Sequence, residues 1–287
     1  MTMPTTPAAI RADRPAPRCG KRLTRAVPLL LLLSMAASAM AATAATGLAA
    51  YKQAGDQLTA MVASAEAGGK LAQLRTPAFE RLVDVVADGD HLIGNGPYPV
   101  DQVGTLLEIC DVANTAFMHL VLFDLKSQVK PGTPPQAAGA AVMRVMADNN
   151  RAFQDELMKV QPFLFRCLAA EVTPITNFML ALKPEEVTEV RRQGLARLRR
   201  GIFMMLTGTL LATRNTGLRE DYRGTVLAAL AQVSEALASV TPLSDRQRIV
   251  AMAERSSSGA APAFQPHLEK IAASFRDQRC EGLCPMK

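Results

Sequence analysis

The sequence holds little of what most enzyme active sites require. It contains three histidines and no tryptophan, and it lacks the H-E-x-x-H, G-x-S-x-G, P-loop and G-x-G-x-x-G motifs. A Ser-His-Asp site would need His91, His119 or His267 beside a serine that no pattern singles out. These absences favour a non-enzymatic protein without excluding an enzyme.

Strand patterns are also missing, because no stretch alternates polar and apolar residues for long enough. Apolar residues recur at helical spacing instead, as in the stripe Val103, Leu106, Cys110, Ala113, Phe117, Leu120 and Val121. We therefore predict an all-α fold, a helical bundle of about seven to nine helices. Its long central antiparallel hairpin joins residues 100–130 to residues 136–170 through a short Pro-rich turn.

Prolines and apolar runs predict further boundaries. Pro162 should kink its helix, and Pro174 should restart the chain. Pro184 should open the next helix, with acidic residues in its first turn. That helix contains an apolar run over residues 201–213, which is too short to cross a bilayer and is predicted to be a buried central helix.

Charge is absent from Ala26 through Tyr51, directly after a basic N-terminus. A basic region, an apolar core and overlapping A-x-A sites are typical of a secretory signal peptide. We predict a signal peptide over residues 1–41, cleaved near Ala41, and a single exported domain over residues 42–287. The protein would then be periplasmic or secreted. The alternative is an uncleaved N-terminal segment that anchors the chain in the membrane.

The excess of positive charge belongs mostly to this leader. Removing residues 1–41 takes away six basic residues and one acidic residue, so the formal net charge falls from +6 to +1. The basic pI is therefore no argument for a nucleic-acid partner, and we expect none. Membrane contact is expected only through an uncleaved leader.

Cys110, Cys167, Cys280 and Cys284 remain after cleavage, and an even count in an exported chain favours disulfides. On a straight hairpin, Cys110 and Cys167 would be offset by roughly 16 Å, whereas a disulfide needs Cα atoms about 6 Å apart. The favoured pairing therefore joins each of them to the C-terminal pair and tethers the tail. The alternative is Cys110 to Cys167 with a local bond between Cys280 and Cys284.

Metal and cofactor signals are weak. Asp88, Asp90 and His91 lie in a Gly-rich loop and are the best metal candidates, although the segment fails the EF-hand template. The C-terminal C-x-x-x-C spacing permits a zinc or copper site. Covalent haem attachment is excluded because Pro285 stands where a histidine is needed. We expect no cofactor.

Three functions remain open. The favoured one is a non-enzymatic envelope protein that binds a protein partner or an apolar ligand, and an exposed apolar groove would mark it. The second is a hydrolase using carboxylates of the 88–91 loop, which a polar cleft gathering that loop with Glu108 or Asp111 would mark. The third is a periplasmic holdase-type chaperone, which would suppress aggregation of an unfolded client.

Overall fold

The computed structural model describes residues 28–68, 74–94, 96, 98–277 and 283. Among these residues every regular element is helical and no strand occurs, so the all-α prediction is confirmed. The α-helices are α1 (Pro28–Gly68), α3 (Pro77–Ala87), α4 (Asp90–Ile93), α5 (Val103–Val121), α6 (Leu125–Gln128), α7 (Pro135–Ala152), α8 (Gln154–Ala181), α9 (Glu189–Arg214), α10 (Glu220–Val240), α11 (Leu243–Ser257) and α12 (Gln265–Arg276). Short 3₁₀ turns lie at Val100–Gln102, Pro184–Glu186 and Pro262–Phe264.

The chain divides into two compact units, residues 1–43 and residues 44–287. Residues 1–27 lie outside the described part, so the signal peptide and its cleavage stay predictions. Within the second unit, the C-terminal half of α1 packs on the bundle. Tyr51 donates a hydrogen bond of 3.0 Å to the Val86 carbonyl of α3, and its ring meets Phe163 of α8 edge to face.

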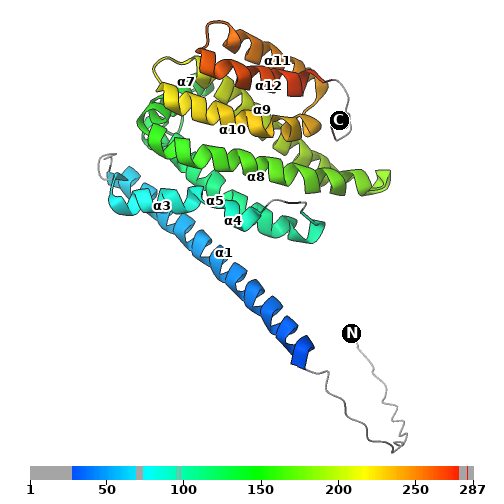
Figure 1. Ribbon diagram of the computed structural model, residues 1–287. Helices are drawn as coiled ribbons and strands as arrows, with labels where there is room; N and C mark the ends of the chain where they lie inside the picture. The colour runs from blue at the N-terminus through cyan, green and yellow to red at the C-terminus, as the bar shows by residue number, and fades with distance from the viewer. Residues whose placement is uncertain (1–27, 69–73, 95, 97, 278–282, 284–287) are drawn as a thin grey trace, which may run out of the picture. The chain divides into compact units, whose positions relative to one another are not determined.

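Helix α8 is the centre of the second unit (Figure 1). It lies between α3 and α5 on one side and α10 on the other, and α12 and α11 follow beyond α10. In the described part of the chain, α8 is also the one helix long and apolar enough to span a membrane. Its apolar composition is accounted for by this position, because large residues such as Phe163, Phe165 and Leu157 are fully buried in the core.

The predicted hairpin is correct for α5 but wrong for its partner. The stripe of α5 is buried as expected at Leu106, Cys110, Ala113, Leu120 and Val121. Residues 136–170, however, form two helices, because α7 ends at Ala152 and α8 begins at Gln154. It is α8, rather than one continuous helix, that pairs with α5.

The prediction that the chain restarts at Pro174 is wrong, because helix α8 continues through both Pro162 and Pro174 and ends only at Ala181. The kink at Pro162 stays a prediction. Each proline removes one backbone hydrogen bond, but the helix faces packed in the core, including buried Pro174, hold the helical path. Pro184 opens a 3₁₀ turn instead of an α-helix. Helix α9 begins at Glu189, where the Thr188 side chain accepts a hydrogen bond from the Arg191 amide.

The apolar run over residues 201–213 is not buried on all sides. Ile202, Leu206 and Leu210 of α9 are fully buried, whereas Met204 is 62% exposed and Leu211 is 56% exposed. The run therefore has a core face and a solvent face, as in an amphipathic helix. Composition alone predicted burial because several of the outward positions also carry apolar side chains.

Candidate functional site

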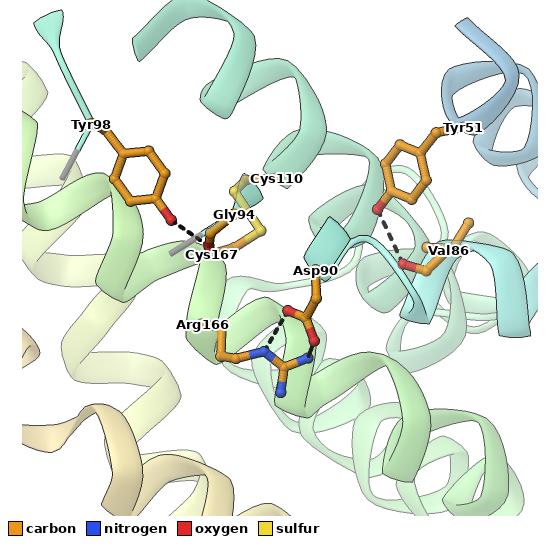
Figure 2. Close-up of a disulfide and its surroundings, with 8 residues drawn as sticks. All are labelled: Tyr51, Val86, Asp90, Gly94, Tyr98, Cys110, Arg166 and Cys167. Atoms are coloured by element: carbon orange, nitrogen blue, oxygen red, sulfur yellow. Dashed lines mark hydrogen bonds and ion pairs between the residues drawn. A yellow bond between two sulfur atoms is a disulfide. The ribbon is translucent and has the colours of Figure 1, made fainter. Parts of the chain in front are cut away.

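The disulfide joins Cys110 of α5 to Cys167 of α8, with the Cα atoms 5.4 Å apart (Figure 2). The favoured pairing of these cysteines with the C-terminal pair is therefore wrong. The sequence argument failed because it treated residues 136–170 as one straight helix and measured both cysteines from the Pro-rich turn.

The break at Phe153 resets the register between the two helices. Phe123, just after α5, packs edge to face on Phe153 with ring centroids 5.7 Å apart. Asn149 fixes the same junction by donating hydrogen bonds to the carbonyls of Val121 and Phe123. Cys110 lies 13 residues before Phe123, and Cys167 lies 14 residues after Phe153. Measured from this shared contact, the two cysteines stand at nearly the same height on antiparallel helices.

The C-terminal cysteines, Cys280 and Cys284, lie outside the described residues, and so does their proposed local bond. The described residue between them, Leu283, is fully buried. Its carbonyl accepts a hydrogen bond from Arg199 of α9. This part of the tail is thus held by burial and hydrogen bonding, without the two core cysteines.

The predicted loop metal site is not assembled by the described residues. Asp88, Asp90 and His91 are all exposed. Asp90 forms a bidentate ion pair with Arg166 of α8, in which the Arg166 Nε atom lies 2.6 Å from the Asp90 Oδ1 atom (Figure 2). Across the described part of the chain, no group of three or more His, Cys, Asp or Glu side chains is placed to hold a metal ion.

Asp90 and Arg166 border a hollow of about 470 Å³ between α4 and α8. Tyr98 lines the same hollow and donates a hydrogen bond of 3.0 Å to the Gly94 carbonyl. The two charged side chains that border the hollow therefore neutralise each other, because the Asp90 carboxylate is paired with the Arg166 guanidinium. Neither Glu108 nor Asp111 borders it.

A second and larger cleft lies beside the disulfide, and we call it the acidic cleft. Its volume is about 500 Å³, and its walls come from α5, α8 and α9. Four leucines give these walls an apolar character, namely Leu107, Leu164, Leu168 and Leu198. The cleft is open to solvent at Leu107, which is 43% exposed.

Polar groups enter the acidic cleft from two helices. Glu108, Asp111 and Asn114 come from α5, and Glu171 comes from α8. Glu108 forms an ion pair of 3.1 Å with Lys52 of α1. The two acids named as possible partners of the 88–91 loop are thus gathered with Glu171, and they are separated from the loop itself.

Glu171 is the most unusual group in the cleft. Only 9% of the residue is exposed, and no hydrogen bond or ion pair joins its carboxyl to another described residue. Burial, and secondarily the nearby charge of Asp111, raise its pKa to about 7. Near neutral pH this group can therefore hold or release a proton, or receive a positively charged partner.

Glu171 was missed by the sequence analysis, although a signal was present. It follows Cys167 by one helical turn, within the apolar segment that also supplies Leu164 and Leu168. A buried carboxyl on a core helix is uncommon, and such a residue is a candidate for a functional role.

No protein-family model, no curated protein and no solved structure matches this chain.

Proposed function

We propose that this chain is an exported helical binding protein that holds a ligand with an apolar body in the acidic cleft. The observation that carries the proposal is the combination of leucine walls with a buried, unpaired carboxyl, Glu171, in one cleft. Most small-molecule sites combine an apolar lining with a few polar groups that fix the orientation of the ligand. We propose that the protein acts by binding rather than by catalysis.

The size of the cleft supports this proposal. Its volume of about 500 Å³ falls within the range of roughly 300–1,000 Å³ that is usual for ligand pockets. Each methylene group of a ligand that leaves water for leucine walls contributes about 0.8 kcal/mol. A ligand with an alkyl body of several carbons would therefore bind with measurable affinity.

Export is the second part of the proposal. The basic N-terminus and its uncharged continuation favour a signal peptide cleaved near Ala41, with a periplasmic or secreted product. The Cys110–Cys167 bond supports an oxidising compartment, where disulfides persist. Intact mass of the protein from its native envelope tests this part. A mass starting near Ala42 is expected, and a mass that includes Met1 would support the anchored alternative.

The alternative functions receive less support. The hydrolase hypothesis relied on Asp88, Asp90 and His91, yet Asp90 is paired with Arg166 and borders a different hollow from Glu108 and Asp111. The holdase hypothesis finds no specific observation in its favour. Suppression of aggregation of an unfolded client, with no binding in the cleft, would revive it.

The binding proposal is tested by filling the cleft from α9. Gly201 lines the cleft, and a Cβ atom added there meets nothing within 4 Å. We expect Gly201→Leu to reduce binding of the uncharged apolar dye Nile red by at least about tenfold, because the new side chain occupies the ligand volume. Fluorescence titration of the protein purified from the envelope measures this effect.

Gly208→Leu is the matched control. Gly208 lies two turns further along α9, it is exposed, a Cβ atom there also meets nothing within 4 Å, and it does not line the cleft. Both substitutions replace a helical glycine and should raise stability by about 0.5–1 kcal/mol. Equal Nile red affinity in the two variants, or no binding by the unmodified protein, would contradict the proposal.

A further inference from the structure

We infer that the ligand of the acidic cleft is an organic cation, an amine with an alkyl body, whose ammonium group is held between Asp111 and Glu171. This inference rests on the proposed function and adds the chemical class of the ligand. The alkyl body would lie against the leucine walls, and the ammonium group would supply the partner that Glu171 lacks.

The burial of Glu171 is the first argument. The residue is only 9% exposed and lines the cleft, and its carboxyl has no hydrogen bond or ion pair to another described residue. A buried carboxylate without a partner is costly, and proteins normally pair such a group. A bound ammonium group would make charge-assisted hydrogen bonds to it and remove this cost.

The charges around the cleft are the second argument. Three carboxyl groups line it, whereas no lysine, arginine or histidine does. Glu108 is paired with Lys52, which leaves Asp111 and Glu171 to act on a ligand. An anionic ligand would face repulsion from both of these groups.

Two arginines of α9 flank the cleft without lining it. Arg197 and Arg200 are exposed, so solvent and salt weaken their repulsion of a bound cation. Arg199, between them, donates hydrogen bonds to the carbonyls of Val240 and Leu283. The groups nearest to the ligand are therefore the acids.

A bare metal ion fits the cleft less well than an organic cation. The carboxyl groups of the described residues form no cluster that could complete a metal coordination shell. The leucines would also remain unused by a metal ion. An alkylamine would use both the carboxyl groups and the leucines, because its ammonium group pairs with the acids and its alkyl chain packs on the apolar walls.

Three probes of equal chain length test the inference. Octylamine, 1-octanol and octanoate are titrated by calorimetry at pH 8 into the full chain purified from the envelope. We expect octylamine to bind at least about tenfold more tightly than 1-octanol, and octanoate to bind most weakly, because only octylamine gains charge-assisted hydrogen bonds. If 1-octanol or octanoate binds as tightly as octylamine, the inference fails while the proposed apolar cleft stands.

Variants show whether the two acids cause the preference. Glu171→Gln and Asp111→Asn should each reduce the advantage of octylamine over 1-octanol by at least about threefold, with 1-octanol binding little changed. Glu235→Gln makes the same change of charge at an exposed position of α10 outside the cleft, and it should preserve the preference. A preference for octylamine that survives both acid substitutions would overturn the inference. If none of the three probes binds, the proposed function itself fails.

Discussion

The buried carboxyl of Glu171 makes a stability prediction that needs no ligand. Its pKa is about 7 in the folded protein, against an ordinary value of 4.5, because burial disfavours the charged form. Between these two values the folded state binds more protons than the unfolded state, so stability falls as the pH rises. The destabilisation caused by ionising Glu171 in the folded protein is absent below about pH 4.5 and complete above about pH 7.

The size of this effect follows from the shift. One pKa unit corresponds to about 1.4 kcal/mol. The rise in the pKa of Glu171 from 4.5 to about 7 therefore lowers the stability of the folded protein by about 3 kcal/mol when the carboxyl is ionised. Glu171→Gln keeps the shape and removes the ionisation. We therefore expect the variant to be more stable than the unmodified protein by about 3 kcal/mol at pH 8, and similarly stable at pH 4.

Urea unfolding at the two pH values measures the difference. Glu235→Gln serves as the control, because this exposed residue should change stability by no more than about 0.5 kcal/mol at either pH. A Glu171→Gln variant that is no more stable than the unmodified protein at pH 8 would refute the reasoning. It would mean that the carboxylate is solvated or paired in solution.

Three further predictions follow from the same structure. Cys110→Ser should destabilise the fold by roughly 4 kcal/mol in urea unfolding, because the bond to Cys167 closes a chain separation of 57 residues, and reduction with dithiothreitol should produce the same loss. Gly89→Ala should lower the free energy of unfolding by about 1–3 kcal/mol, since its Cβ atom would overlap the Phe163 ring. Gly104→Ala is the control, because its Cβ atom meets open space, and it should raise the free energy of unfolding by about 0.5–1 kcal/mol. Thermal denaturation compares the two variants. Octylamine affinity should fall about tenfold from pH 8 to pH 6 in calorimetry, because the buried carboxyl of the cleft must lose its proton to hold an ammonium group.

The fold class could be read from the sequence because helical periodicity records burial directly. The stripe through Leu106, Cys110 and Ala113 is a sequence pattern, and it lies in the core of α5 as expected. The start of α3 follows similarly local rules, because the Thr76 side chain accepts a hydrogen bond from the Phe79 amide and Pro77 occupies the first turn.

Long-range register could not be read in the same way. The break at Phe153 carries no proline or glycine, so the strongest local signs of a helix end are missing between α7 and α8. This one break moves Cys167 to the height of Cys110 and changes the disulfide pairing. Conversely, Pro174 is a strong local stop signal that tertiary packing overrides.

The candidate site was only partly accessible for the same reason. The sequence analysis named Glu108 and Asp111 as possible partners of the 88–91 loop, which they do not join. Their grouping with Glu171 depends on the register of α5 against α8, which only the folded structure supplies.

Titration of the protein with octylamine, followed by NMR of labelled leucine methyl groups, tests the central claim most directly. The account predicts that the signals of Leu164, Leu168 and Leu198 shift together in a saturable way. The signals of buried leucines that do not line the cleft, such as Leu227 and Leu268, should stay in place. Absence of shifts, or shifts confined to leucines outside the acidic cleft, would contradict the claim that this cleft is the ligand site.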